Sequence, residues 1–467
     1  MIEFHNTLGG QRDVFASLIP GRVTMYTCGP TVYDFAHIGN YRAYVFEDLL
    51  KRFLRFAGYG VTHVMNITDV DDKTIAGANA QGLTLGAYTE KYTQAFFEDL
   101  RVLNIAPADY YPRATDHIPE MARIIAGLLE KGYAYRQEGS IYFSIAKFPG
   151  YGKLSRIRPE DLRVTDRIEA DEYEKESARD FALWKAPKEG EPVWETEVGP
   201  GRPGWHIECS AMSSKYLGQP FDIHCGGVDN IFPHHENEIA QSEAYGGKPL
   251  SKTWLHCHHL IINGEKMSKS KGNYFTLKDL LKKGVDPLAL RFLLLSTHYR
   301  RVLNFTFEAL DQAAAALRRI KDFLYEIETS AFPPGKIAGV PELLAEARTK
   351  FADGLGDDLN ISLALTALFE LIKKINVLVK DGRMLADDAR AASSFVYSLD
   401  EVLAVLPAKK EEELPEELER KIRDRELARK DRDFRRADEI RRELAEAGVL
   451  LEDTKDGVRW KLVKKIE

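Results

Sequence analysis

The chain has 467 residues, too many for a single ordinary hydrophobic core, so its length indicates two to four domains. Its hydrophobic content of 44% is that of a globular protein, and its net charge of −7 excludes a basic surface over the whole molecule. No apolar run approaches the ~18 residues of a membrane span and the N-terminus lacks a signal-peptide pattern, so we expect a cytoplasmic protein without a membrane partner.

The first hundred residues show the pattern of a parallel sheet. Residues 23–28 predict a strand, residues 38–57 an amphipathic helix with apolar positions at three- and four-residue steps, and residues 61–68 a second strand. Such a strand–helix–strand unit forms a right-handed crossover between parallel strands. Ligands bind at the carboxyl ends of such strands, where Cys28 and Thr68 fall.

The remaining chain predicts an insertion, the second half of the sheet, a bundle and a small module. In the insertion Asp116 is expected to cap a helix, and residues 255–262 predict one later strand. Apolar stripes after residue 304 predict helices that pack together, and a charged, proline-containing linker follows them. In the last module Asp433 is expected to cap a helix that precedes a hairpin.

These patterns predict an α/β protein. We expect a Rossmann-like parallel-sheet domain with an inserted connective domain, then an all-α helical bundle and a small α+β module. The predicted boundaries are 1–115 and 201–250 for the two halves of the sheet domain, 116–200 for the insertion, 251–305 for a region with a lysine loop, 306–406 for the bundle, 407–419 for the linker and 420–467 for the module.

The four cysteines lie far apart with no CxxC pair, which argues against a disulfide framework and suits a reducing compartment. Pro233 at a first helical position would place His234 and Glu238 on one helix face. Cys28 ends the first strand, and Cys209 is expected where another strand of that sheet ends. Two thiolates, an imidazole and a carboxylate suit Zn²⁺, although on spacing alone buried structural cysteines and surface histidines are the commoner outcome.

Two short motifs lie more than 200 residues apart. Residues 37–40, His-Ile-Gly-Asn, open the first helix, where backbone N–H groups can meet a phosphate. Residues 266–270, Lys-Met-Ser-Lys-Ser, supply ammonium groups in a polar loop, which taken alone is an ordinary basic surface loop. Together they resemble the nucleotide-binding signatures of class I aminoacyl-tRNA synthetases, with Asn40 in place of the usual histidine.

Longer segments resemble the cysteinyl-tRNA synthetase family. They cover nearly the whole chain in the family's order, which makes the match more specific than any single motif. The segments are 26–34 (YTCGPTVYD), 66–73 (NITDVDDK), 201–210 (GRPGWHIECS), 232–238 (FPHHENE), 437–441 (ADEIR) and 451–454 (LEDT).

The resemblance implies the partners and the site. It implies one zinc ion per chain, magnesium carried with ATP, and L-cysteine, ATP and cysteine tRNA as substrates; nothing suggests a large apolar self-association face, so we expect a monomer. It also identifies 251–305 as a stem-contact region and 420–467 as an anticodon-binding module. The implied residues are Cys28, Cys209, His234 and Glu238 for zinc; Gly29, Thr31, Thr68 and Trp205 for cysteine; His37, Gly39, Asn40, Gly227, Asp229, Lys266 and Lys269 for ATP, with His37, Asn40, Lys266 and Lys269 also catalytic.

Selection of cysteine explains why an enzyme of this family would place a metal beside its nucleotide site. A pocket that relies on shape cannot reject an isostere such as serine by more than about a hundredfold. Zinc favours a thiolate ligand, so a separate editing domain becomes unnecessary. Four protein ligands make a closed site, and we therefore expect Glu238 to be the weak ligand that yields as substrate binds. Cys225 and Cys257 match no ligand position and are expected to be free thiols.

Adenylate formation is expected to depend on positioning and charge. His37 and Asn40 can donate hydrogen bonds, Gly39 leaves room for adenine, and the loop lysines can close onto the phosphates. Asn40 keeps a donor but has no titratable proton, so it offers no general acid. Gly227 and Asp229 resemble a ribose-binding segment, for which a plain turn is an equal alternative.

Two further features that suggest a function also have an ordinary structural explanation. The acidic cluster of Asp69, Asp71 and Asp72 suggests a magnesium site, but a helix-capping, salt-bridged turn is the safer interpretation. Residues 420–467 hold 16 basic and 12 acidic residues, which alone indicates only a solvated charged helix. Unstacked RNA bases are recognised through arginine and aromatic contacts, so the candidates for tRNA contact are Arg435, Arg436, Arg459 and Trp460, although a tryptophan there is more often a core residue.

Two rival functions stay open from the sequence. One is a ligase that activates cysteine and passes it to an amino sugar, against which the resemblance at 437–454 argues. The other is a non-catalytic sensor of zinc and nucleotide, against which the two phosphate motifs argue.

Overall fold

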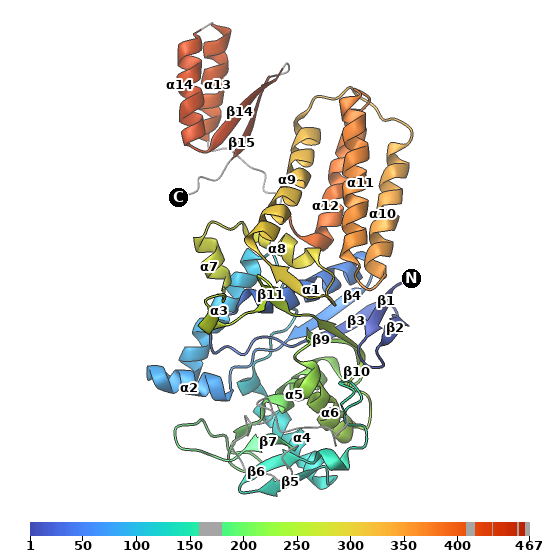
Figure 1. Ribbon diagram of the computed structural model, residues 1–467, viewed down its shortest axis with the longest axis vertical. Coiled ribbons are helices and arrows are strands. Elements are labelled where there is room, and N and C mark those ends of the chain that lie inside the picture. The colour runs from blue at the N-terminus through green and yellow to red at the C-terminus, as the bar shows by residue number, and fades with distance from the viewer. Residues whose placement is uncertain (158–179, 408–415, 432, 455–456, 463–467) are drawn as a thin grey trace.

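A four-stranded parallel sheet forms the centre of the chain, as the computed structural model shows (Figure 1). Its strand order is β10-β9-β3-β4, so the chain before the insertion supplies one half and the chain after it the other. The predicted fold class is confirmed. The strands are β3 (Arg22–Thr27), β4 (Gly60–Met65), β9 (Phe221–Gly227) and β10 (Ser251–Cys257). The described residues are 1–157, 180–407, 416–431, 433–454 and 457–462.

Helices cover both faces of this sheet, as expected for parallel strands with apolar side chains on both sides. On one face α1 (Ile38–Phe56) packs through its apolar stripe against Met25, Ile223 and Leu255. On the other face lie α5 (Trp205–Leu217) and α6 (Glu236–Gly246), which Figure 1 shows between the sheet and the inserted elements. The start of α1 and the carboxyl ends of β3 and β9 therefore meet at one edge.

The connection after β4 contains α2 (Asp72–Gln81) and α3 (Leu85–Val102). Asp71 caps α2 by accepting a hydrogen bond from the Lys73 backbone N–H, at 2.9 Å. The Asp72 carboxylate pairs with Lys185 and Arg202, and Asp69 accepts bonds from Thr115. Because the three carboxylates bond to different partners, the capping interpretation is confirmed over a magnesium cluster.

The insertion forms a small antiparallel sheet with one long helix. Asp116 lies inside a short turn of helix, Ala114–His117, and α4 begins after it at Ile118, so the predicted cap at Asp116 is wrong. A proline in the first turn favours this start because its missing N–H needs no partner there. The elements are α4 (Ile118–Glu130), β5 (Ala134–Gln137), β6 (Ser140–Phe143), a turn at Ile145–Lys147, β7 (Phe181–Lys185) and β8 (Arg202–Pro203).

The chain at 255–262 is two strands rather than the single strand predicted. β10 ends at Cys257 and belongs to the parallel sheet, which therefore extends past the boundary predicted at residue 250. The next strand, β11, belongs to a second sheet because the chain turns away at His258, whose N–H donates to the Tyr299 carbonyl at 2.7 Å. That sheet consists of β11 (Leu260–Ile262), β12 (Glu265–Lys266) and β13 (Leu303–Phe305).

An N-terminal hairpin, β1 (Glu3–Asn6) and β2 (Gln11–Val14), was not predicted. The Asn6 side chain fastens it to the edge of the parallel sheet by accepting a hydrogen bond from the Trp254 N–H at 3.0 Å.

The helical bundle is built as predicted from four amphipathic helices, and α8 joins it to the sheet domain. Arg291 of α8 is fully buried, pairs with Asp48 of α1 and donates to the carbonyl of Leu403 at 2.8 Å. The bundle is thereby packed against the helix that carries His37. The helices are α7 (Leu277–Lys282), α8 (Pro287–Ser296), α9 (Phe307–Thr329), α10 (Val340–Gly356), α11 (Ile361–Lys380) and α12 (Ala386–Leu403).

The C-terminal module has its own small core, and Figure 1 shows it at the opposite end of the molecule from the insertion. Asp433 caps its second helix as predicted, at 3.0 Å from the Arg436 N–H. Its first helix begins at Glu416, inside the segment 407–419 that was expected to be a linker. The elements are α13 (Glu416–Lys430), α14 (Phe434–Glu446), β14 (Val449–Thr454) and β15 (Gly457–Leu462).

Within the described residues, no helix combines the length and the apolar character that crossing a bilayer requires.

Candidate active site and metal centre

Thiol, imidazole and carboxylate groups converge where β3 ends. The ligand atoms of Cys28, His234, His235 and Glu238 all lie within 4.8 Å of one another. Three of these residues were predicted as metal ligands, and His235 was not. The fourth predicted ligand, Cys209, is not one of these four, but it hydrogen-bonds to two of them, Cys28 and His234.

Cys209 reaches the cluster from a helix, so the prediction that it follows a strand is wrong. It lies in α5, four residues after Trp205 and therefore on the same helix face. The hydrogen bond from Cys28, together with the nearby His234, lowers the pKa of the Cys209 thiol to about 6. Burial raises the pKa of Cys28. The pair thus favours one thiolate and one thiol in the absence of a metal.

His234 and Glu238 meet as their spacing predicts. A single irregular turn, Ile231–His235, leads into α6, and His234 Nε2 lies 3.0 Å from Glu238 Oε1. His224 on β9 lies 2.9 Å from the other carboxylate oxygen, Oε2. Although burial acts in the opposite sense, the anionic Glu238 and Cys209 raise the pKa of His234 to about 10. The buried donors therefore attract a positive charge, which fits a metal cation.

The predicted cysteine-binding residues line the same edge. Two backbone bonds join the loop after β3 to the loop after β4: Val32 N–H to the Thr68 carbonyl and Thr68 N–H to the Pro30 carbonyl, both 3.1 Å. A Cβ atom on Gly29 would lie 1.7 Å from the Asn66 carbonyl oxygen, so only glycine allows this approach. Gly29, Thr31 and Thr68 are thus brought together beside Cys28.

Trp205 lies at the first position of α5 and is 41% exposed. Its ring stacks on the His234 imidazole with a centroid distance of 4.3 Å. The predicted pocket therefore has an aromatic wall that touches a candidate metal ligand.

The two phosphate motifs, far apart in sequence, are in contact. The Ile38 N–H at the start of α1 donates to the Phe275 carbonyl at 3.0 Å, just after the lysine loop. A Cβ atom on Gly39 would lie 2.9 Å from the His37 ring and 3.2 Å from Met267 Cε. Gly39 was expected to leave room for adenine, and in the structure its missing side chain also lets Met267 of the second motif reach α1.

Lys269 lies beside the start of α1. Its ammonium group is 2.6 Å from the Asp34 carboxylate and 5.0 Å from the centre of the Tyr274 ring. Tyr274 in turn packs edge-on against His37. Lys266 is exposed on β12.

His37 and Asn40 are oriented by the helix start. Asn40 Oδ1 accepts the backbone N–H of His37 at 3.1 Å, which leaves the amide NH₂ group as the free donor. Burial lowers the pKa of His37, and the Lys269 charge adds to this, so the imidazole is neutral at neutral pH. The negative charge of Asp229, beyond β9, opposes this lowering of the His37 pKa. Gly227 and Asp229 form a turn in which Gly227 N–H donates to Asn230 Oδ1 at 3.1 Å.

Comparison with known families identifies the chain. Residues 14–315 match the family described as "tRNA synthetases class I (C) catalytic domain". Residues 350–407 match "DALR domain", and residues 411–460 match "Cysteinyl-tRNA ligase anticodon binding domain".

This chain belongs to the cysteine–tRNA ligase family. Among its relatives, the cysteine–tRNA ligase of Solibacter usitatus is 49% identical over 98% of this chain and 99% of that protein. The cysteine–tRNA ligase of Chlamydia pneumoniae is 49% identical over 98% of both chains. The family that the sequence motifs indicated is confirmed.

Solved class I synthetases share the fold. Methionyl-tRNA synthetase of Mycobacterium tuberculosis, solved with methionyl-adenylate, aligns with a TM-score of 0.58 at 17% identity over 82% of this chain and 90% of that one. A leucyl-tRNA synthetase of Agrobacterium radiobacter, solved in a ternary complex with tRNA, aligns with a TM-score of 0.58 at 11% identity over 84% and 85%. At these identities the likeness concerns the fold alone.

In this ligase-family chain, the candidate tRNA contacts have different surroundings. Arg435 and Arg436 are exposed on α14, where both face Glu439. Trp460 is half-buried and packs against the core of the module. The side chain of Arg459 lies outside the described part of the structure.

Sequence reasoning missed a group of histidines behind the metal cluster. His235 Nε2 lies 3.1 Å from Cys28 Sγ, and His235 Nδ1 lies 2.8 Å from His256 Nε2. His256 Nδ1 in turn lies 2.7 Å from the Thr7 hydroxyl. His224 on β9 pairs with Trp254 on β10, so His256 lies two positions further along the neighbouring strand. The sequence reveals that these histidines are close only once β9 and β10 are known to pair.

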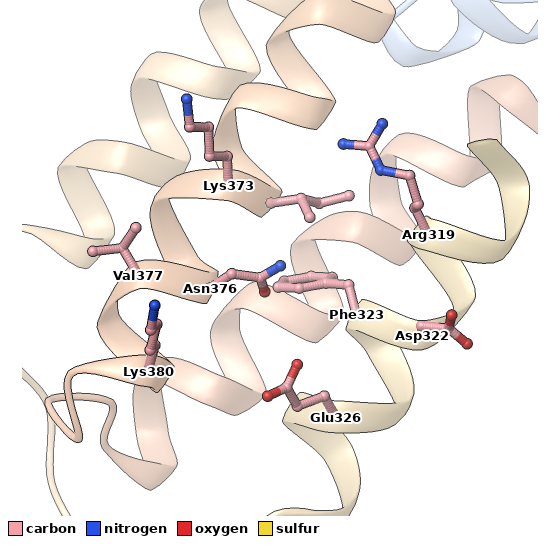
Figure 2. Close-up of a pocket in the computed structure, with 9 residues that line it drawn as sticks. Arg319, Asp322, Phe323, Glu326, Lys373, Asn376, Val377 and Lys380 are labelled. Carbon is pink, nitrogen blue, oxygen red and sulfur yellow. The ribbon is translucent and has the colours of Figure 1, made fainter. Parts of the chain in front are cut away.

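A surface groove in the bundle is separate from this site (Figure 2). It lies between α9 and α11, and its rim mixes acidic and basic side chains around an apolar floor. It contains none of the predicted site residues. The lining residues are Arg319, Asp322, Phe323, Glu326, Ile372, Lys373, Asn376, Val377 and Lys380.

Proposed function

We propose that this protein is an ATP-dependent cysteine–tRNA ligase that selects its amino acid by thiolate coordination to a zinc ion. It would convert L-cysteine and ATP to cysteinyl-adenylate and pyrophosphate, then transfer the cysteinyl group to the 3′ end of cysteine tRNA. One observation carries this proposal. A thiol–imidazole–carboxylate cluster and two joined phosphate motifs lie at the same carboxyl edge of one parallel sheet.

The residues that would hold the zinc ion are Cys28, Cys209, His234 and Glu238. Two thiols, an imidazole and a carboxylate are ligands that Zn²⁺ accepts, and their buried surroundings favour a cation. A bound zinc ion would supply a soft Lewis acid that prefers the thiolate of cysteine to the hydroxyl of serine. His224 hydrogen-bonds to Glu238 Oε2. This bond would still hold the carboxylate if the substrate displaced its other oxygen as a ligand.

The loops after β3 and β4 would hold the rest of the amino acid. The backbone bonds of Pro30 and Val32 to Thr68 hold Gly29 and Thr31 beside it, and the Trp205 ring stacks on His234 at the neighbouring side. The substrate carboxylate must then point toward α1, because the phosphate motifs lie there.

Adenylate formation joins a carboxylate oxygen of cysteine to the α-phosphorus and breaks the bond to the pyrophosphate oxygen. No proton moves in this step, so a neutral His37 and an Asn40 without a titratable proton suffice as hydrogen-bond donors. Lys269 would exchange Asp34 for the departing pyrophosphate, and Lys266 would approach as the loop closes. Magnesium would accompany ATP as its complex.

Transfer requires the acceptor end of the tRNA to reach the edge of the sheet while its anticodon reaches a distant binding module. The bundle and the C-terminal module provide that span, and Arg435, Arg436, Arg459 and Trp460 are the proposed contacts. We propose that the chain acts as a monomer. Because α13 (Glu416–Lys430) already contains residues 416–419, the functional module would include them.

The direct test combines metal analysis with pyrophosphate exchange. Purified protein should contain about one zinc per chain, and exchange should depend on cysteine, with serine at least a hundredfold less effective. Removal of the metal by a chelator should abolish the preference for cysteine. Protein without a tightly bound transition metal, or protein that activates serine as readily, would overturn the zinc proposal.

The role of the module has its own test. A chain that ends at residue 407 retains the sheet domain and the bundle, so cysteine-dependent pyrophosphate exchange should be unchanged. Charging of cysteine tRNA should fall sharply. Intact charging by the shortened chain would give the module another purpose, and charging of an amino sugar instead of tRNA would support the rival ligase.

A further inference from the structure

Lysine side chains surround two aromatic rings in the loop that leads into α1. Lys73 of α2 lies over the Tyr33 ring, 5.0 Å from its centre. Lys91 of α3 and Lys278 of α7 each lie 5.9 Å from the centre of the Phe35 ring. Three helices that are separate in the sequence thus bring exposed ammonium groups to one short segment. We call these three lysines and two aromatic residues the basic patch.

The charge of the basic patch is available to a ligand. An aromatic ring attracts an ammonium group but carries no net charge, so it holds a lysine in place without neutralising it. None of the three ammonium groups forms an ion pair with a carboxylate among the described residues. Each lysine has an acidic neighbour in the sequence, and each of these neighbours has another partner: Asp72 pairs with Lys185 and Arg202, Glu90 pairs with Arg113, and Asp279 accepts the Thr276 hydroxyl.

The two aromatic residues of the patch are held by α3. The Tyr88 hydroxyl donates to the Tyr33 carbonyl at 2.6 Å, and Tyr88 itself is buried. Phe35 packs edge-on against Tyr92, over which Lys91 also lies at 5.0 Å. The Tyr33 side chain is nevertheless 37% exposed. It therefore offers a flat apolar surface in a fixed place, next to cations.

The basic patch borders the proposed site of adenylate formation. Asp34 lies between the two aromatic residues and pairs with Lys269 of the lysine loop, while Thr31 and His37 lie just before and just after the segment. In Figure 1, α2, α3 and α7 lie along the same side of the molecule as the C-terminal module. A ligand that extends from that module to the edge of the sheet along this side would therefore meet the patch.

We propose that the basic patch binds the single-stranded 3′ end of the tRNA. The three ammonium groups contact its phosphates and the Tyr33 ring stacks on one of its bases, the combination by which proteins hold single-stranded nucleic acid. The assignment rests on the proposed function, because the terminal ribose must reach cysteinyl-adenylate while the nucleotides before it lie at the border of the site. Such contacts position the strand without selecting its sequence.

The first test compares tRNA binding with adenylate formation. Lys73→Ala and Lys91→Ala each remove one ammonium group and leave the residues proposed for ATP and cysteine in place. The Kd for cysteine tRNA should rise about threefold or more, and the slope of log affinity against log salt should become shallower by about 0.7 for each lysine removed, as for one phosphate contact of a single strand. The KM values for ATP and cysteine in pyrophosphate exchange should stay within about twofold. Lys91→Arg keeps the charge and should restore tRNA binding.

The aromatic contact is tested separately. Tyr33→Ala should raise the Kd for cysteine tRNA about tenfold, as for the loss of one stacked base. Tyr33→Phe keeps the ring and should bind tRNA as the native chain does. Because the hydroxyl of Tyr33 has no part in the proposed contact, a loss in Tyr33→Phe equal to that in Tyr33→Ala would contradict stacking.

A shortened tRNA identifies the part of the molecule that contacts the patch. The affinity of cysteine tRNA is compared with that of the same tRNA after removal of its single-stranded 3′ end. The native chain should bind the shortened tRNA more weakly, and Lys91→Ala and Tyr33→Ala should cause no further loss with it, because the group that they contact is gone. The matched control is Lys248→Ala: Lys248 is an exposed lysine just before β10, at the opposite end of the parallel strands, and its removal should leave both affinities unchanged.

Three results would overturn the proposal. Unchanged tRNA affinity and salt slope in the lysine variants would make the patch an ordinary solvated surface. An equal loss with intact and shortened tRNA would assign the patch to another part of the tRNA, and a KM for ATP that rises as much as the Kd for tRNA would assign it to the phosphates of ATP. A failure of the proposed function is distinct, because the native chain itself would then neither bind nor charge cysteine tRNA.

Discussion

The metal cluster and the lysine loop lie at the same edge of the sheet but are built in opposite ways. The side chains of the cluster come from the residue after β3, from α5, and from α6 or the turn before it, and Cys209, His234 and Glu238 are each at most 2% exposed. Lys269 comes from a loop, its side chain is 65% exposed, and a single surface ion pair holds it. One region is fixed by packing, and the other is free to exchange partners.

The difference matches two different tasks. Distinguishing sulfur from oxygen requires donor atoms held within a few tenths of an ångström, which regular elements and buried hydrogen bonds provide. Neutralising pyrophosphate requires cations that move with the reaction, and burying an ammonium group permanently would be costly. Gly264 and Gly272 flank the loop with positive φ angles of 80° and 67°, which supports local bending.

The largest effect should follow from a ligand change in the rigid region. Cys209→Ser replaces a thiol by a hydroxyl in a buried helix position and removes the group whose pKa lies near 6. Zinc content should fall from one per chain to below about a tenth, because an alcohol is a poor ligand for this ion. Cysteine-dependent exchange should fall at least a thousandfold, roughly 4 kcal/mol. Metal analysis and exchange kinetics measure both.

Cys225→Ser is the control for that change. Cys225 is a fully buried free thiol on β9 that is no part of the cluster, so its loss should alter stability but not zinc content. Full zinc content in Cys209→Ser would contradict the proposed ligand set and favour His235 as the fourth ligand.

The second effect concerns the lysine loop. Lys269→Ala removes the cation that would meet pyrophosphate, so adenylate formation should slow by about 2–4 kcal/mol, as for the loss of one preorganised donor. Cysteine binding should change little, because the metal cluster is intact. The control is Lys271→Ala, since Lys271 lies in the same loop but pairs with Glu265. Rapid-quench measurement of adenylate formation, with cysteine binding measured separately, checks both; equal losses in the two quantities would count against the role.

Much of the fold could be predicted because its signals are local. The stripe of α1, the cap at Asp433 and the four bundle helices follow from periodicity and capping within single segments. The errors come from local patterns that fit more than one structure. Cys209 was placed after a strand because short apolar runs do not distinguish strand from helix, and Asp116 lost its capping role to the turn that precedes α4.

The site was partly predictable for a different reason. The long motifs indicated which residues belong to it, but contacts between motifs depend on how strands pair. The bond from His224 to Glu238 joins β9 to α6, and that from Thr68 to Glu208 joins the loop after β4 to α5. Neither contact has a sequence signature. His224 and Glu208 could therefore be recognised as neighbours of the site only once the elements were placed.

A third, smaller effect should come from the support of a proposed ligand. His224→Phe keeps the aromatic volume that stacks on Trp254 but removes the hydrogen bond to Glu238 Oε2. Zinc affinity should fall about 10- to 100-fold, the usual cost of losing the partner of a metal ligand. Competition with a chelating dye measures it. His224→Gln retains a donor and should lose less; an equal loss in both variants would indicate that packing, not the bond, matters.

The smallest effect is expected for Asp34→Asn, which loosens the resting contact of Lys269. The pair is largely exposed, and such pairs contribute ~0.2–1 kcal/mol. Because Asp34 competes with phosphate for the same ammonium group, its neutralisation should lower the KM for ATP by up to about fivefold and leave the KM for cysteine unchanged. The difference should shrink in high salt, which screens exposed charges. A raised KM for ATP would instead mean that Asp34 itself contributes to the ATP complex, and the lysine loop would then be held by the site rather than released from it.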